Sequence, residues 1–193
     1  MTTETRSETR TNNGKPGAIP SGRWRIVPQE SHVGFRVRKM GLYHVKGRFR
    51  EIDGTVEFAP AGASAAVEID PSSITTRMPP RDLHLRSSQF LDVKRHPRIV
   101  ISADRGLVAG APAITVPAVF EIRGQRHEVE LAGHFVQGSD RAPVLHLQGA
   151  LDRHDFGIRP PQPFEMIVGR RVELDVELVL AAAGDEEPGA DIR

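Results

Sequence analysis

The 193-residue sequence predicts an all-β protein, a closed antiparallel barrel of eight strands with a short helix that caps one end. Apolar and polar residues alternate along many short segments, which places successive side chains on opposite faces of a strand. Turn-forming residues separate these segments. Antiparallel sheets of many short strands commonly close on themselves, because closure removes exposed edges, so we expect a barrel rather than an open sheet.

The patterned region forms one expected domain over residues 22–183, a usual length for a single β domain. Residues 1–21 are rich in Thr, Glu, Arg and Asn and lack apolar periodicity, so they are predicted to be a disordered N-terminal tail. Residues 184–193 have the same character and are predicted to be a flexible C-terminal tail.

The first strands are predicted at 33–37 and 45–49, where Val and Phe alternate with Gly, Lys and Arg. The apolar set then changes phase in the segment 52–58, which contains Asp53 and Gly54. This dipeptide suits either a tight turn or a β-bulge. We expect a bulged, bent strand here.

A further strand is predicted at 65–69, after which the alternation stops. Segment 78–93 begins with two prolines that suit a helix entrance and carries Asp82 in its first turn, so it is the expected capping helix. Two sets of side chains would lie on different faces of that helix: Leu83, Ser87 and Phe90 on one, and Arg81, His84 and Ser88 on the other.

The second half of the chain is predicted to contain strands at 99–103, 116–122, 129–135, 144–151 and 172–180. The last of these has the clearest pattern, because its even-numbered residues are Val or Leu and most of the others are acidic. Arg123-Gly124-Gln125 is expected to form a hairpin turn, since glycine readily adopts the positive φ that such turns need.

Composition excludes several classes of function. The 26 Lys and Arg residues nearly balance the 25 Asp and Glu residues, so no strong field favours nucleic acid. No apolar run approaches the roughly 18 residues that a membrane-spanning helix needs. The N-terminal residues contain no apolar signal-peptide core, and we therefore expect a cytoplasmic protein that does not span a membrane.

Metal binding and catalysis are not expected from the side-chain patterns. There is no cysteine, and the spacing of His127, His134, His146 and His154 matches no metal-binding motif, so these histidines are expected to be solvated strand residues. No serine lies in a nucleophile elbow, so we predict that the protein is not an enzyme and has no cofactor. The alternative is a small enzyme acting on an amphipathic substrate, with His84 as acid–base group beside Asp92 or Asp155.

Separated motifs occur in a fixed order along the chain: residues 31–37, Gly41-Leu42 and residues 45–49; residues 81–87 with Phe90, Asp92 and Pro97; residues 120–124; residues 153–157; and Val168-Gly169 before the last strand. In these motifs the sequence resembles the YceI-like family, whose members have a lipocalin-like barrel and bind polyisoprenoid lipids. It departs from the family pattern at Glu30 and Lys39, where members often carry histidines, so no role of those histidines is transferred.

The resemblance implies a ligand inside the barrel. We expect a long-chain polyisoprenoid or isoprenoid quinone, held for storage, transport or protection. A haem or another amphipathic ligand is the alternative. The resemblance also suggests a homodimer.

An eight-stranded barrel is either filled by side chains or wide enough for one ligand. The residues expected to contact the tail are apolar and lie on predicted inward faces, on the capping helix or in the motif at 153–157: Phe35, Val37, Phe49, Phe58, Leu85, Phe90, Phe120, Leu131, Phe135, Leu147 and Phe156. At the barrel mouth, Arg81, His84 and Arg86 would meet a diphosphate, hydroxyl or quinone oxygen. The alternative is that the apolar residues are packed core, and that Arg81, Asp82 and Arg86 cap the helix and form surface ion pairs.

Overall fold

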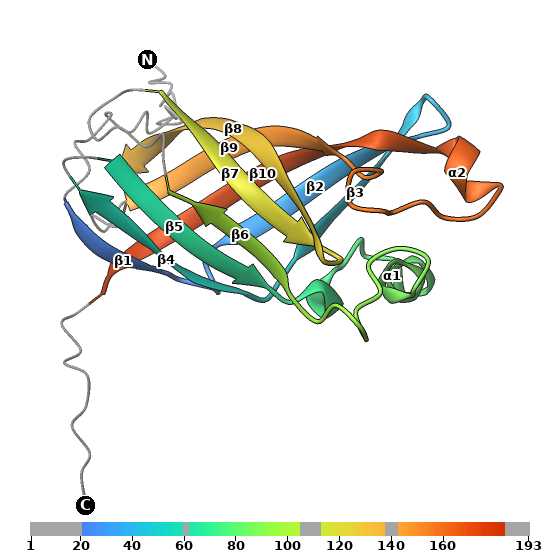
Figure 1. Ribbon diagram of the computed structural model, residues 1–193, viewed down its shortest axis with the longest axis horizontal. Coiled ribbons are helices and arrows are strands. Elements are labelled where there is room, and N and C mark those ends of the chain that lie inside the picture. Colours follow the sequence, from blue (N-terminus) through green and yellow to red (C-terminus); the bar gives the residue numbers. More distant parts are fainter. Residues whose placement is uncertain (1–20, 60–61, 105–112, 138–142, 184–193) are drawn as a thin grey trace, which may run out of the picture.

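The computed structural model describes residues 21–59, 62–104, 113–137 and 143–183, and these form a barrel with helices at one end (Figure 1). Ten strands follow one another in a single sheet: β1 (Gly22–Ile26), β4 (Ile52–Ala59), β5 (Gly62–Ile69), β6 (Ile99–Ala103), β7 (Ile114–Ile122), β8 (Gln125–Gln137), β9 (Pro143–Asp152), β10 (Val168–Ala182), β2 (His32–Lys39) and β3 (Tyr43–Phe49). All pairings that join them are antiparallel. Except for Ser21, the predicted tails at 1–21 and 184–193 lie outside the described residues.

The ring closes because β1 pairs with β10 as well as with β4. Eight strands therefore form a closed antiparallel barrel, as predicted, and β2 and β3 are two extra strands. Strand β10 pairs with β2 between Val168 and Glu177, and with β1 between Leu180 and Ala182. The β2–β3 hairpin thus extends the wall beyond the point where β1 ends.

The predicted bulge at Asp53 and Gly54 is wrong. Strand β4 pairs with β5 in unbroken register from Ile52 to Ala59. The phase of the apolar residues changes because two consecutive exposed residues, Arg50 and Glu51, separate β3 from β4. Strand β1 was not predicted, because only two of its residues, Trp24 and Ile26, are apolar, and two are too few to establish an alternation.

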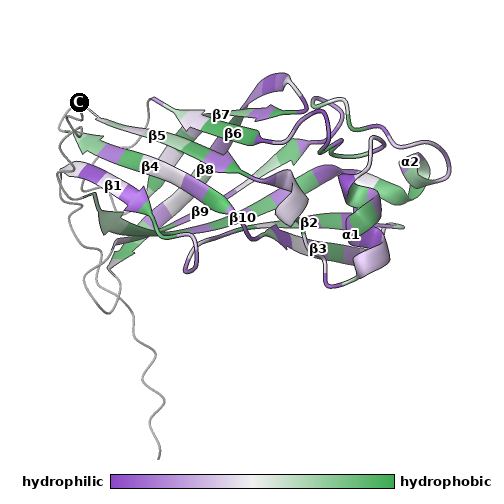
Figure 2. Ribbon diagram, turned by 90° about the horizontal axis from the view of Figure 1, so that it is seen from below, coloured by the Kyte–Doolittle hydropathy of each residue, from purple (hydrophilic) through white to green (hydrophobic). Residues whose placement is uncertain are grey.

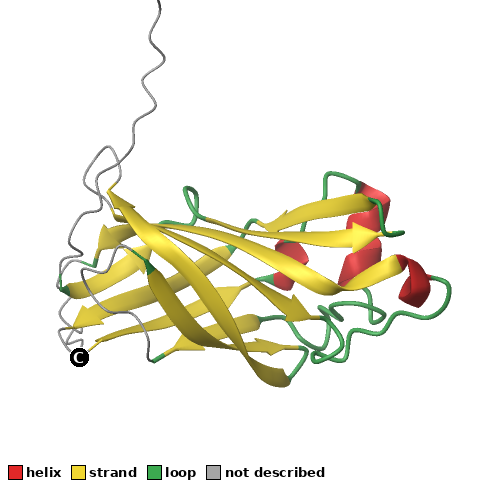
Figure 3. Ribbon diagram, turned by 90° about the horizontal axis from the view of Figure 1, so that it is seen from above, coloured by secondary structure: helices red, strands yellow, loops and turns green. Residues whose placement is uncertain are grey.

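The capping helix is shorter than the predicted segment 78–93. Helix α1 (Pro79–Arg86) ends where Ser87 adopts an extended conformation. Leu83 and Phe90 consequently do not share a helical face: Leu83 is 69% exposed, whereas Phe90 lies beyond the helix and is buried. A 3₁₀ turn, η1 (Pro71–Ser73), precedes α1, and a one-turn helix, α2 (Phe164–Ile167), precedes β10. Figure 3 shows the helices gathered at one end of the barrel.

The predicted hairpin turn between β7 and β8 is confirmed. Arg123 and Gly124 have φ angles of 54° and 73°, both in the left-handed region. Two consecutive residues of this kind match the right-handed twist of the flanking strands.

The barrel is packed from its middle to the end away from the helices. The rings of Phe58 and Phe135 meet edge to face, with centroids 5.3 Å apart. Apolar side chains from most strands are buried around them, including Ile26, Val56, Val116, Leu131, Leu147 and Leu180. The alternation of apolar and polar residues that produces this core is visible along the strands in Figure 2.

Gly133 provides a test of the β8–β9 pairing. A Cβ atom at this position would overlap the carbonyl oxygen of His146 and lie 2.9 Å from the Cα of Leu147. Both are backbone atoms that cannot move without disturbing the ladder. We therefore expect Gly133→Ala to lower the free energy of unfolding by about 3 kcal/mol, measured by urea denaturation. Its exposed neighbour is the control: Ala132→Ser should change the free energy of unfolding by less than about 0.5 kcal/mol. Equal changes in both variants would contradict the close approach of β9 to Gly133.

Candidate functional site

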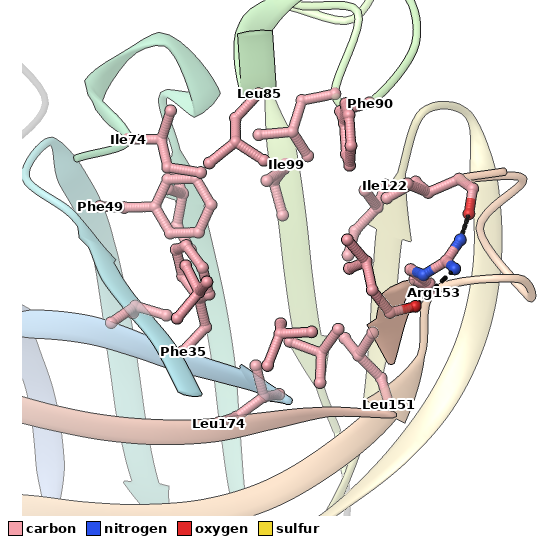
Figure 4. Close-up of a pocket in the computed structure, with 18 of the residues that line it drawn as sticks. Phe35, Phe49, Ile74, Leu85, Phe90, Ile99, Ile122, Leu151, Arg153 and Leu174 are labelled. Atoms are coloured by element: carbon pink, nitrogen blue, oxygen red, sulfur yellow. Dashed lines mark hydrogen bonds between the residues drawn. The ribbon is translucent and has the colours of Figure 1, made fainter. Parts of the chain in front are cut away.

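The half of the barrel nearest α1 and α2 is hollow. It encloses a cavity of about 220 Å³, lined by side chains of β2, β3, β5, β6, β7, β9 and β10, of both helices and of the loops beside them. Figure 4 shows these side chains directed toward one another around the space. The lining is apolar except for Lys39, Arg81, His84 and Arg153. Lys39, His84, Phe164 and Val168 line it at the helical end, which we call the mouth.

Some residues that the sequence nominated line this cavity, and others do not. The lining set includes Phe35, Val37, Phe49, Arg81, His84, Leu85, Phe90 and Phe120. Six lie elsewhere: Phe58, Leu131, Phe135 and Leu147 in the packed half, Phe156 buried against the His127 ring, and Arg86 with its Nη2 donating to the carbonyl of Ile74. Alternation indicates that a side chain points inward, but not how far along the barrel it lies.

Sequence reasoning missed the remaining lining residues. They are Val33, Lys39, Val45, Ile69, Ile74, Leu91, Ile99, Ile101, Ile122, Leu151, Arg153, Ile158, Phe164, Val168, Val172 and Leu174. Most are aliphatic residues in the inward phase of predicted strands, so the same alternation could have identified them. Ile158 and Phe164 lie between β9 and β10, where no periodic pattern marks them.

Gly47 makes room for an aromatic pair in the cavity wall. A Cβ atom here would lie 2.7 Å from Cε1 of Phe35 and 2.9 Å from Cγ2 of Thr76. Because glycine leaves that space free, the Phe35 ring lies against β3 and meets the Phe49 ring at a centroid distance of 5.9 Å. The two rings line one side of the cavity (Figure 4).

Asp82 anchors α1 to the segment after η1. Its buried carboxylate accepts hydrogen bonds from Thr76 N at 2.8 Å, from Thr75 Oγ1 at 3.2 Å and from Thr76 Oγ1. Burial alone would raise the pKa of Asp82, but the hydrogen bonds from Thr76 and Thr75 and the charge of Arg81 outweigh it and hold the pKa below its ordinary value. The expected surface ion pair at Asp82 is therefore wrong, since this carboxylate is buried and held mainly by threonines.

The Arg81 guanidinium is also held by Thr76. Its Nε donates to Thr76 Oγ1 at 2.7 Å and its Nη2 to the Thr76 carbonyl at 3.0 Å. Arg81 thus lines the cavity with a side chain that is fixed before any ligand arrives.

His84 lies at the contact between α1 and α2. Its Nε2 is 2.6 Å from the Gln89 amide oxygen, and its ring meets those of Phe90 and Phe164 edge-on, each at a centroid distance of 5.0 Å. Asp92, one of its expected carboxylate partners, instead pairs with Arg95 at 2.8 Å. The acid–base pair with Asp92 is therefore not formed here.

Arg153 organises the loop between β9 and β10. The side chain is only 3% exposed, and it donates to the carbonyls of Ile158, Val168 and Gly169 at 2.6–3.1 Å and to Glu165 Oε2 at 2.9 Å. The hydrogen bond and the charge of Arg153, together with those of His154, outweigh burial and hold the pKa of the Glu165 carboxyl below its ordinary value. A buried cation is stable only when its donors are satisfied in this way.

His154 is not a solvated strand residue, as the sequence had suggested. It lies in the turn after β9, its side chain is 16% exposed, and its Nε2 is 2.6 Å from Glu165 Oε1. Within the described ranges, no three His, Cys, Asp or Glu residues are grouped so that they could hold a metal ion. No helix in the same ranges is long and apolar enough to cross a membrane.

A family model described as the YceI-like domain matches residues 24–180. A UPF0312 protein of Pectobacterium atrosepticum is 33% identical over 165 residues, which are 81% of each chain. A UPF0312 protein of Vibrio cholerae is 25% identical over 155 residues, covering 76% of this chain and 78% of that one.

Solved structures with the same barrel include the following two. Burkholderia cenocepacia BcnA has a TM-score of 0.72 at 19% identity, covering 81% of this chain and 99% of that chain. A structure named as a polyisoprenoid binding domain from Saccharophagus degradans, implicated in plant cell wall breakdown, has a TM-score of 0.66 at 15% identity, covering 84% and 99%. At these identities the likeness shows the fold.

The Asp82 anchor predicts a pH-dependent stability. Because the folded-state pKa is depressed, the carboxylate stabilises the fold above its unfolded pKa, and this contribution is lost as the pH falls through the folded value. We expect Asp82→Asn to lower the free energy of unfolding by about 1–3 kcal/mol at pH 7, because the amide leaves buried donors unpaired. The difference in the free energy of unfolding between Asp82→Asn and wild type should shrink as the pH falls below 3.8, the ordinary pKa of an aspartate.

Urea denaturation at neutral and acidic pH measures both effects. Asp155→Asn, at an exposed position in the turn after β9, is the matched control and should leave the curves unchanged. A difference for Asp82→Asn that is constant with pH would contradict the assignment of a depressed pKa.

Proposed function

We propose, because the chain belongs to the YceI-like family, that it binds a long-chain polyisoprenoid or isoprenoid quinone in the barrel cavity, for storage, transport or protection. The observation that carries the proposal is the apolar cavity itself: 20 of its 24 lining residues are apolar. A hydrocarbon tail in this space gains about 25 cal/mol per Å² of apolar surface removed from water. The name of the Saccharophagus degradans domain supports the same class of ligand.

The cavity has a polarity that orients the ligand. Phe35, Ile101 and Leu174 line its wall toward the packed half, where a tail would lie. The polar lining residues Lys39 and His84 lie at the mouth, where a head group would lie. The ammonium of Lys39 has no charged or hydrogen-bonding partner among the described residues, so it is the residue most available to a diphosphate, hydroxyl or quinone oxygen.

The cavity volume bears on how a long tail is held. About 220 Å³ is below the roughly 300–1,000 Å³ of typical ligand pockets. A long tail therefore needs additional space, and the movable side chains are those outside the barrel wall. Phe90 and Leu91 follow α1, and Phe164 begins α2, so these three side chains are proposed to move aside when the ligand enters.

Catalysis and other ligands are the competing functions. The enzyme alternative predicts that His84→Ala abolishes turnover, whereas the binding proposal predicts a modest change in affinity. A haem or another amphipathic ligand would be distinguished by identifying the bound molecule. The cytoplasmic location and the homodimer remain predictions.

Native mass spectrometry of the protein purified from its own host tests the proposal directly. We expect a stoichiometric adduct that organic extraction identifies as an isoprenoid. Protein that is empty after gentle purification, and that also refuses an isoprenoid added in excess, would contradict it.

A cavity-filling variant tests whether the ligand binds inside the barrel. Ile101→Trp on β6 adds bulk to the cavity wall, and we expect it to weaken binding of a polyisoprenol such as solanesol by about tenfold or more, since the added ring competes with the tail for space. Affinity is measured by quenching or displacement of a fluorescent isoprenoid, with thermal unfolding as a check on the fold. Val119→Trp, on the neighbouring strand β7 and outside the cavity lining, is the matched control and should bind as wild type does.

A further inference from the structure

In the part of the chain that the structure describes, the large exposed apolar side chains gather at one end of the barrel. Among the described residues, seven large apolar side chains are exposed: Met40 and Leu42 in the β2–β3 turn with Tyr43 at the start of β3, Met78 and Leu83 at α1, and Phe164 and Met166 at α2. We call these seven residues the mouth ring. The three elements that carry them lie together at the helical end of the barrel (Figures 1 and 2).

Direct contacts join the three elements into one rim. The Met40 amide donates to the Ile167 carbonyl at 2.7 Å, which ties the β2–β3 turn to the end of α2. The His84 ring meets the Phe164 ring at 5.0 Å, which ties α1 to α2. Phe164 belongs to both the mouth ring and the cavity lining, so the exposed apolar surface is continuous with the apolar interior.

The rim carries an excess of available cations. Arg38, Lys39, Arg77 and Arg159 lie on or beside these elements and have no acidic partner among the described residues. The acidic side chains of the two helices are already engaged, Asp82 by Thr75 and Thr76 and Glu165 by Arg153. Exposed Asp155, in the loop that carries Arg159, offsets one of these four cations, so the charge that the rim presents is still positive.

We infer that the mouth ring docks on the surface of an anionic lipid bilayer, with its apolar side chains in the interface and the neighbouring arginines and lysine at the phosphates. Exposed apolar side chains with cations beside them are the combination that binds peripheral proteins to anionic membranes. This inference rests on the proposed function, since docking would let the apolar tail of the ligand pass between bilayer and cavity without crossing water. The occupant is a bilayer because the cations beside the ring complement phosphate, whereas a second copy would bring a like charge against them.

Flotation of the full chain with extruded vesicles tests the docking. We expect binding to phosphatidylcholine vesicles that contain phosphatidylglycerol, weaker binding to phosphatidylcholine alone, and loss of binding at high salt. Leu42→Ser with Met166→Ser should weaken vesicle binding by about tenfold or more, and Arg38→Gln with Arg159→Gln should do so on anionic vesicles only. The matched control removes two cations from β1 at the opposite end, Arg23→Gln with Arg25→Gln, and should bind vesicles as wild type does.

Tryptophan fluorescence supplies an independent readout. The chain has one tryptophan, Trp24, which lies on β1 at the end away from the mouth. We expect its emission to be unchanged by anionic vesicles. In a Trp24→Phe background, Tyr43→Trp should shift to the blue when the same vesicles are added, because residue 43 enters the interface.

The outcomes separate docking from ligand binding. None of Leu42, Met166, Arg38 and Arg159 lines the cavity, so both double variants should still bind isoprenoid supplied from solution. Wild-type protein that binds isoprenoid but does not float with anionic vesicles would overturn the docking alone. Protein that floats but binds no isoprenoid would overturn the proposed function and leave the docking in place. Absence of vesicle binding together with a dimer that Leu42→Ser and Met166→Ser dissociate, measured by sedimentation, would assign the ring to a second copy and overturn the inference.

Discussion

The architecture depends on the change of partner along β10. At its C-terminal end this strand pairs with β1, where Ile26 lies opposite Leu180 and both side chains are almost completely buried. Nearer the mouth the same edge of β10 pairs with β2, whose other neighbour, β3, meets the segment after β5 through a single bridge between Arg48 and Thr75. Where continuous ladders close the ring, the interior is packed. Where only the Arg48–Thr75 bridge joins β3 to the segment after β5, the interior is hollow. One strand thus produces both a stable core and a cavity.

The interrupted ladder explains why the charged side chains of Asp82 and Arg153 are buried near the mouth. Backbone groups outside a ladder need other partners when they are removed from water. Asp82 accepts from the amide of Thr76, and Arg153 donates to the carbonyl of Ile158 in the β9–β10 loop and to those of Val168 and Gly169 at the irregular start of β10. Each therefore does for an irregular segment what ladder hydrogen bonds do for a strand. These anchors fix α1 and α2 beside the cavity while leaving Phe90 and Phe164 outside the sheet, so the mouth is positioned by polar contacts and not by strand pairing.

The sequence predicts the barrel well because alternation is a local property. It also nominates inward residues such as Phe35 and Phe49 correctly as interior. The sequence does not show that Phe49 lines the cavity whereas Phe58 lies in the packed half, since both point inward on consecutive strands. The position of a side chain along the barrel depends on strand register and tilt across the whole sheet. Arg153 lies in a motif that the family resemblance marks, but no local pattern indicates that its carbonyl partners are Ile158 in the β9–β10 loop and Val168 and Gly169 at the start of β10. The end of α1 at Arg86 and the single turn of α2 were not predicted either, since no apolar periodicity marks them.

The position of the mouth ring makes sense of the small cavity. A carrier that leaves a membrane must not expose a wide apolar opening to water, since each exposed Å² costs about 25 cal/mol. Here Phe164 and Phe90 pack against His84 at the mouth, which narrows the opening of the cavity. Phe164 is both one of the side chains proposed to move and part of the contact that joins α1 to α2 in the rim. Contact of the rim with a bilayer would supply an apolar environment for Phe164 as it leaves the cavity, so opening would cost least at the place where a lipid is available to enter.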